Sequence, residues 1–122
     1  MFSERRKSQR VHFHQEVTII KANGTHFQCK ADNLSIGGLA LKTEESLFSG
    51  ERVLVRFNVF NPAQNHYFEA ELMCNVSHAV KLTHPEGMSM IGLQFQKIDR
   101  ATNKSLRAFI DHLAAGKYQR AS

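Results

Sequence analysis

Short stretches in which apolar and polar residues alternate fill most of the chain, and they predict β-strands. The clearest stretch covers residues 53–59, where every second side chain is Val or Phe, so that one face of the strand is apolar. Further strands are expected at residues 16–21, from about residue 26 onward, and at 39–41, 68–74, 76–82 and 91–95. Short strands at this regular spacing predict a barrel or a sandwich.

The strand that begins near residue 26 changes phase along its length. Its apolar residues occupy odd-numbered positions up to Ala31 and then even-numbered positions at Leu34 and Ile36. Because successive side chains of a strand point to opposite faces, one residue must be inserted near Asp32 and Asn33. We expect a β-bulge or a turn there, and bulges often redirect side chains beside functional sites.

The period changes again near the C-terminus. Four apolar residues there have the i, i+3, i+4, i+7 spacing of one helix face, namely Leu106, Phe109, Ile110 and Leu113. Asp99 or Thr102 is expected to cap the start of this helix, and Gly116 to end it. Since so short a helix is marginal in water by itself, its apolar face should plug one end of the barrel or lie on the sheet.

Length and composition indicate one globular domain. The chain has 122 residues, of which 42% are hydrophobic and 22% charged. We divide it into a basic arm at residues 1–15, a barrel with its C-terminal helix at 16–116, and a tail at 117–122. No apolar run is long enough to span a bilayer, and no apolar segment follows Arg5-Arg6 as it would in an export signal. We therefore expect a cytoplasmic protein without membrane insertion.

The charge of the chain favours anionic partners. Its formal net charge is +5, and phosphate-bearing ligands and nucleic acids are both compatible with that sign. The arm contributes Arg5, Arg6 and Arg10, whose planar guanidinium groups suit bidentate contacts with phosphate or with the O6/N7 edge of guanine. Taken alone, such a run more often forms a solvated basic tail.

A second polar cluster occurs at the expected bulge. Asn33 and Ser35 stand two residues apart, so on an extended strand their side chains share a face and could together bind a base edge. Gly38 would let the backbone approach a flat ligand closely. The alternative interpretation of this stretch is a simple Ser/Asn/Gly turn between two strands.

Together the two clusters resemble the signature of a known family. Arg6-x-x-x-Arg10 followed by Asn33-x-Ser35-x-x-Gly38 is similar to the two-part motif of the PilZ domain family. The single hairpin between the two parts, the later strand at residues 92–95 and the C-terminal helix extend the resemblance over most of the chain. The resemblance implies an all-β fold with one C-terminal helix, in which six or seven antiparallel strands form a barrel.

The resemblance also implies a ligand, the bacterial second messenger cyclic di-GMP, bound between arm and barrel. Arg6 and Arg10 would then clamp guanine and phosphate, while Asn33, Ser35 and Gly38 would contact the other guanine. Arg5 has no fixed role in the family. It could stack on a base or reach a phosphate of a second ligand molecule, so either one or two ligands per chain remain open.

Other chemistries have little support in the sequence. Cys29 and Cys74 lack Cys-x-x-Cys spacing, and His12-x-His14 has no third ligand nearby, so we expect no metal site. No Gly-x-Ser-x-Gly elbow, Walker loop or paired carboxylates are recognisable. We therefore expect no enzyme activity and no cofactor other than the cyclic di-GMP ligand.

Three functions follow from these observations. The favoured one is a stand-alone receptor or adaptor that relays ligand binding to a protein partner, which the sequence does not identify. A small basic β-barrel that binds single-stranded nucleic acid is the second. Nucleic acid is the less favoured partner because most of the nine Phe fit core positions rather than an exposed stacking surface. The third is a PilZ-like interaction domain without ligand.

Overall fold

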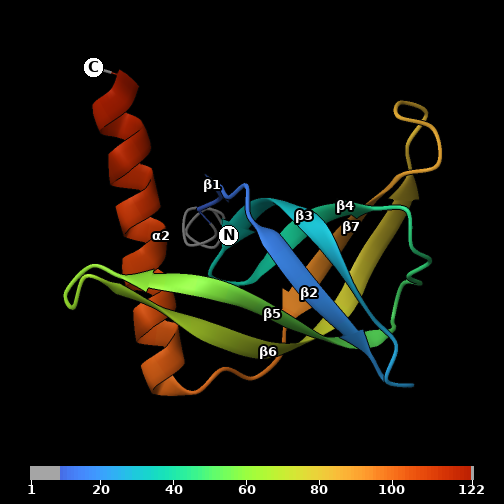
Figure 1. Cartoon of the computed structure of the whole chain (residues 1–122), viewed down its shortest axis with the longest axis horizontal. Coiled ribbons are helices and arrows are strands. Elements are labelled where there is room, and N and C mark those ends of the chain that lie inside the picture. The colour runs from blue at the N-terminus through green and yellow to red at the C-terminus, as the bar shows by residue number, and fades with distance from the viewer. Residues whose placement is uncertain (1–8, 122) are drawn as a thin grey trace, which may run out of the picture.

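Seven strands and one C-terminal helix make up the part of the chain that the structure describes (Figure 1). The structure is a computed structural model and describes residues 9–121, with side chains from 9 to 116. Its elements are β1 (Val11–His12), β2 (Glu16–Lys21), β3 (His26–Ser35), β4 (Gly38–Thr43), β5 (Arg52–Asn61), β6 (His66–Lys81), β7 (Ser89–Phe95) and α2 (Arg100–Ala121). Within that range no helix is long and apolar enough to cross a membrane.

The strands close into an antiparallel barrel. Hydrogen bonds connect them in the order β3-β2-β5-β6-β7-β4, and β4 pairs again with β3, so that the six strands form a ring. The short strand β1 is added outside this ring, on β3. The all-β barrel with one C-terminal helix that the resemblance implied is therefore confirmed.

Alternate residues of the strands form the core, as the hydrophobic pattern predicted. In β5, Val53, Val55, Phe57 and Val59 are all at most 3% exposed, while the residues between them face outward. Bulges in β3 and β6 interrupt this alternation. The pairing of β3 with β4 shifts between Ala31 and Asn33, which confirms the expected bulge.

The predicted strands at residues 68–74 and 76–82 are one continuous strand, β6, of 16 residues. The sequence offers no turn between them, and the change of phase comes instead from a register shift between Val76 and His78. As a result Val76 and Ala79 both pair with core residues of β7, Leu93 and Ile91. A bulge thus replaces the break that the pattern suggested.

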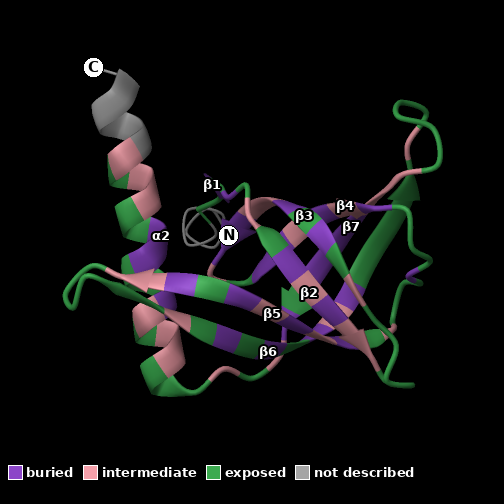
Figure 2. Cartoon of the chain, viewed as in Figure 1, coloured by how far each residue is buried: buried purple, intermediate pink, exposed green. Residues whose placement is uncertain are grey.

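The helix covers one end of the barrel with its apolar face, which is the purple stripe toward the strands in Figure 2. Leu106, Phe109 and Ile110 are buried there, and the Phe109 ring meets Phe13 edge-on with 5.8 Å between centroids. Phe13 is itself only 3% exposed. The core therefore includes part of the stretch before residue 16, although the limits proposed for arm, barrel and tail remain predictions.

The two ends of α2 test the predicted N-cap and the predicted stop at Gly116. The Asp99 carboxylate accepts a hydrogen bond from the Thr102 amide at 2.7 Å, so Asp99 is the N-cap of α2. The predicted stop at Gly116 is wrong, because α2 continues to Ala121. Gly116 does not have the positive φ of a helix-ending glycine, and a glycine within a helix costs only about 1 kcal/mol relative to alanine.

Candidate functional site

The end of the arm and the β3 motif lie side by side. Arg10 precedes β1, which pairs with the end of β3 and sets His12 opposite Asn33. From this position the Arg10 guanidinium donates a hydrogen bond to the side-chain oxygen of Asn33. The structure thus joins one residue from each half of the predicted motif. Arg5 and Arg6 lie outside the described residues.

The Asn33 side chain is held from two sides. Its oxygen accepts the hydrogen bond from Arg10, and its amide nitrogen donates to the Asp32 carboxylate at 3.2 Å. Asp32 also belongs to the irregular part of β3, where the chain shifts register against β4. The bulge therefore places a carboxylate, an amide and a guanidinium next to one another, a set with both donors and acceptors for a polar ligand edge.

Ser35 has a clear structural role in the turn between β3 and β4. Its hydroxyl, which is buried, donates to the Gly38 carbonyl at 3.4 Å and accepts from the Gly37 amide at 3.3 Å. The turn interpretation weighed for this stretch is thus correct for the hydroxyl of Ser35. A role of Ser35 in ligand binding stays a prediction.

Gly38 is required by the packing of two strands. A Cβ added at this position would lie 2.0 Å from the carbonyl oxygen of Leu93 in β7, a distance that no side chain can tolerate. The close approach at Gly38 is therefore made by backbone of the protein itself. Contact between Gly38 and a ligand, which the resemblance implies, is not tested by this geometry.

The register of the strands extends the site across the barrel surface. Side chains of paired residues in antiparallel strands point to the same face. One outward row crosses β1, β3, β4, β7 and β6 through His12, Asn33, Ala40, Gly92 and His78. The next row in register consists of Ser35, Gly38, Gln94 and Asn75, of which Ser35 and Gly38 are buried and Gln94 is exposed. The residues between the two rows are buried, namely Val11, Leu34, Leu39, Leu93 and Val76.

The middle of these two rows has almost no side chains, because Gly38, Ala40 and Gly92 occupy it. At its far side the His78 ring lies over Gly92, where an added Cβ would come within 2.1 Å of the ring. The Ser77 hydroxyl fixes this edge by donating to the Gly92 carbonyl at 3.0 Å and by contacting His78 Nδ1 at 3.3 Å. We call the surface of the two rows the strip.

His78 and Gln94 belong to the strip, and they were not among the site residues predicted from the sequence. Gly92 and Gln94 lie in the stretch that carried part of the family resemblance, so that stretch was the available signal. Which residues of β6 would face them depends on strand pairing and on the bulge near Ser77. Neither can be derived from local sequence pattern.

A small hollow connects the strip region to the helix. Its volume is about 90 Å³, and it is lined by Gln9, Ile36, Arg107, Ile110 and Asp111. These residues come from the arm, from the turn between β3 and β4, and from α2. Arg107 is oriented by Asn103, whose side-chain oxygen accepts from Arg107 Nε at 3.1 Å. A further guanidinium therefore stands near the place where the arm enters the barrel.

The two cysteines have no part in this site. Both are buried, and burial raises the pKa of each thiol to about 12, with a further contribution from Glu16 and Glu45 at Cys29. They stay protonated at neutral pH and are poor nucleophiles and metal ligands. Among the residues that the structure describes, no group of three His, Cys, Asp or Glu is placed to hold a metal ion.

Comparison with known proteins agrees with this geometry. The model of the PilZ domain family matches residues 4–112, which is most of the chain. No sequence among the curated proteins matches the chain closely.

Three solved structures share the fold. The inhibitor of motility MotI/DgrA from Bacillus subtilis has a TM-score of 0.76 at 17% identity, covering 95% of this chain and 53% of its own. The PilZ domain of YcgR from Escherichia coli, solved with c-di-GMP, has a TM-score of 0.66 at 17% identity and coverages of 96% and 97%. The MrkH–c-di-GMP complex of K. pneumonia has a TM-score of 0.73 at 14% identity, with coverages of 93% and 54%. The chain thus spans about half of MotI/DgrA and of MrkH, and nearly all of the separate YcgR domain.

Proposed function

Because the chain belongs to the PilZ domain family, we propose that it is a receptor for cyclic di-GMP and not an enzyme. We further propose that it acts in the bacterial cytoplasm as an adaptor that relays ligand binding to a protein partner. The observation that carries the proposal is the hydrogen bond from Arg10 to Asn33, which brings the arm and the β3 motif into one site. Two solved relatives with this fold, YcgR and MrkH, contain c-di-GMP.

The charged groups of the arm would bind the phosphates. Cyclic di-GMP carries two phosphodiester charges, and Arg5, Arg6 and Arg10 offer guanidinium groups that bind phosphate or guanine in a bidentate manner. Arg10 already stands at the edge of the strip through its contact with Asn33. Arg5 and Arg6 would complete the clamp from the part of the arm that precedes it.

The strip would accept a guanine base. Ala40 is the small residue left partly open at its centre, since the His78 ring covers Gly92 and the Leu93 backbone packs against Gly38, so a planar ring would stack at Ala40 beside His78. Asn33 offers an amide donor and acceptor at one side of this surface, and His78 and Gln94 offer polar groups at the other. Hydrogen bonds of this kind to a base edge are a source of selectivity between purines.

The relay to a protein partner rests on the position of the arm. The arm enters the barrel beside α2, and Gln9 shares the 90 Å³ hollow with Arg107 and Asp111 of that helix. A ligand that draws the arm toward the strip would change the surface formed by arm and helix together. A protein partner that binds this surface would then respond to the ligand.

The single-stranded nucleic acid alternative has less support. A stacking surface for bases needs several exposed aromatic side chains on one face. In the described part of the chain the exposed large aromatics are Phe48 and Tyr67. Phe48 precedes the start of β5, whereas Tyr67 lies in β6 and pairs with Phe60 near the other end of β5, so they do not form one surface.

Titration of Arg10→Ala with cyclic di-GMP tests the proposal. Loss of a charge-assisted contact should weaken binding by about 2 kcal/mol or more, which is roughly 30-fold. The matched control is Arg100→Ala, which removes an exposed arginine at the start of α2, outside the proposed site. It should leave the affinity for cyclic di-GMP unchanged. Arg10 is exposed, so both variants should melt like the parent. Equal loss in both variants, or none in Arg10→Ala, would refute a site at the arm.

A further inference from the structure

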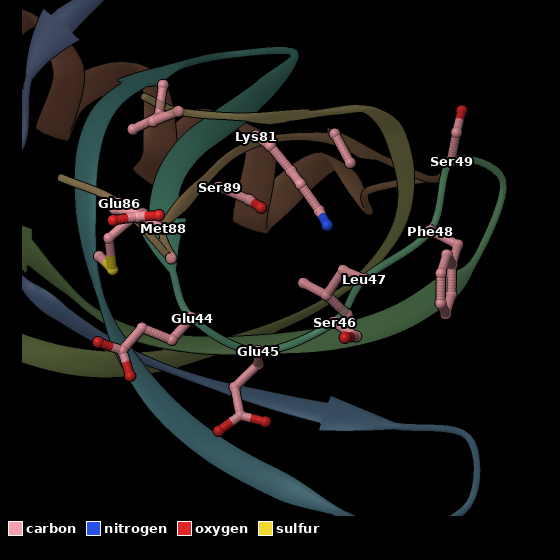
Figure 3. A pocket seen from close by; sticks show the side chains of 13 residues that line it. Glu44, Glu45, Ser46, Leu47, Phe48, Ser49, Lys81, Glu86, Met88 and Ser89 are labelled. Atoms are coloured by element: carbon pink, nitrogen blue, oxygen red, sulfur yellow. The ribbon is translucent and has the colours of Figure 1, made fainter. Parts of the chain in front are cut away.

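The end of the barrel opposite α2 contains a second and larger hollow. Its volume is about 590 Å³, within the range typical of ligand and anchor pockets. The segment after β4 (residues 44–49) forms one wall, and the β6–β7 hairpin (residues 79–89) forms the other (Figure 3). None of the residues of the proposed cyclic di-GMP site that the structure describes lines it. It is therefore a separate feature of the molecule.

The segment that forms the first wall is anchored at several points, although it contains no helix or strand. Lys21 Nζ donates to the Ser46 carbonyl at 3.0 Å, and the Gly50 amide donates to the Val76 carbonyl at 2.7 Å. The Phe48 amide donates to the Glu51 carboxylate at 3.0 Å. In addition Leu47 is only 5% exposed and inserts into the core. The wall of the hollow is thus preorganised, which lowers the entropic cost of binding.

This anchored segment presents an aromatic side chain to solvent. Phe48 is 69% exposed, next to the buried Leu47. On the facing hairpin, Ala79, Leu82 and Met88 contribute apolar groups to the lining of the hollow. One exposed apolar residue needs no explanation, but an aromatic on an anchored backbone at the rim of a hollow of mixed polar and apolar lining has the character of an interface anchor.

The charge around the hollow is opposite to that of the whole chain. Glu44, Glu45 and Glu86 line it, with the carboxylates of Glu44 and Glu45 directed to the outside of the 44–49 segment, and one cation, Lys81, points its ammonium into the hollow (Figure 3). Three carboxylates and one ammonium give −2, whereas the chain as a whole carries +5. Lys81 forms no ion pair with any of the residues that the structure describes. A partner surface that fits this rim is therefore basic.

We propose that this end of the barrel is a docking site for a basic segment of a partner protein. The segment would place one aliphatic or aromatic side chain in the hollow beside Leu47 and Phe48, and its Lys or Arg residues would face Glu44, Glu45 and Glu86. The site lies at the Thr43 end of β4, whereas the ligand motif lies at the Gly38 end. The two sites can therefore be occupied at once.

Nuclear magnetic resonance titration of the full chain with synthetic peptides tests the proposal, without any nucleotide present. The probe is a peptide that is acetylated at its N-terminus and amidated at its C-terminus. It has a central leucine flanked on each side by two lysines. Two matched peptides replace the leucine by serine or the lysines by glutamates. The lysine–leucine peptide should shift amides of residues 44–49 and 79–89, whereas both matched peptides should bind more weakly.

Variants of the protein locate the effect. Glu44→Gln/Glu45→Gln should weaken binding of the lysine–leucine peptide about tenfold, since exposed ion pairs each contribute modestly. The matched control, Glu69→Gln/Glu71→Gln on β6, removes the same charge from the side of the barrel and should have no effect.

Absence of amide shifts at the hollow, or equal binding of the glutamate peptide, would overturn the proposal. An equal loss of affinity in both double variants would do the same, because it would show attraction by net charge alone. Since no nucleotide is present in the peptide titration, its failure would not affect the cyclic di-GMP proposal. Failure of the cyclic di-GMP titration would likewise not affect the docking proposal.

Discussion

Asn33 and Ser35 belong to one motif, but the structure gives them different tasks. The Asn33 side chain faces outward and contacts Arg10, so its removal affects mainly the site. The Ser35 hydroxyl is buried and holds the turn between β3 and β4 through Gly37 and Gly38. One motif can therefore combine a candidate binding residue with a structural one.

Replacement of each residue by alanine should show this difference. Ser35→Ala should lower the free energy of unfolding by about 1 kcal/mol, because the Gly37 amide and Gly38 carbonyl lose a partner. Asn33→Ala should leave stability almost unchanged and weaken cyclic di-GMP binding by about 1 kcal/mol. Urea unfolding and calorimetric titration of both variants measure the two effects. If Asn33→Ala destabilised the fold more than Ser35→Ala did, the assignment of tasks would be wrong.

At the scale of elements, the start of α2 makes a prediction about pH. Hydrogen bonds from Thr102 lower the pKa of Asp99 from its ordinary value of 3.8. Because the folded-state pKa is the lower one, this stabilisation is complete above the unfolded pKa and is lost as pH falls through the folded value. Asp99→Ala should therefore lower Tm slightly at pH 7, and the difference from the parent should shrink below about pH 4.

Asp99→Asn is the matched control for the cap. Asparagine keeps an oxygen that can accept from the Thr102 amide but does not titrate. Its Tm should stay near that of the parent at pH 7 and should fall less than that of the parent on acidification, because its cap does not titrate. Thermal melts of the three proteins between pH 3 and 7 decide the matter. An unchanged Tm of Asp99→Ala at pH 7 would show that the carboxylate does not act as a cap.

The strands and helix could be predicted from sequence to the extent that their signals are local. The period of two marked β5, the change of parity marked the bulge in β3, and the helical spacing marked α2. The break expected between residues 74 and 76 was wrong because a bulge inside β6 changes the phase without ending the strand. The stop expected at Gly116 was wrong because glycine ends a helix only where the backbone adopts a positive φ.

The candidate site was less predictable than the fold. Arg10 and Asn33 were found because family resemblance linked two motifs that are 23 positions apart. His78 and Gln94 were missed, since their place beside Gly38 and Gly92 depends on how β4, β7 and β6 pair. Such pairing joins residues distant in sequence and leaves no local pattern.

On the scale of the whole molecule, α2 closes one end of the barrel and the 590 Å³ hollow marks the other. The strip lies on the outer face between these ends, and the motif turn faces the helix. β4 connects the two regions, with Gly38 at the ligand motif and Thr43 beside the hollow. The two proposed sites therefore lie on separate surfaces of one sheet.

The number of ligands is also a property of the whole molecule. Arg5 adds a third guanidinium to the arm, and a second dinucleotide stacked on the first would bring two more phosphate charges to neutralise. We expect two ligands per chain for the parent and one for Arg5→Ala, measured as the stoichiometry of calorimetric titration. A count of one for the parent would exclude the role given to Arg5, although not the site itself.

Calorimetric titration of the unmodified chain with cyclic di-GMP and with cyclic di-AMP tests the central claim most directly. Adenine carries a donor where guanine carries the O6 acceptor, so a site that binds the guanine edge must distinguish them. The account predicts saturable binding of cyclic di-GMP and binding of cyclic di-AMP at least about tenfold weaker, since a mismatched base contact costs roughly 1–3 kcal/mol. Absence of saturable binding by cyclic di-GMP, or equal affinity for both nucleotides, would contradict it.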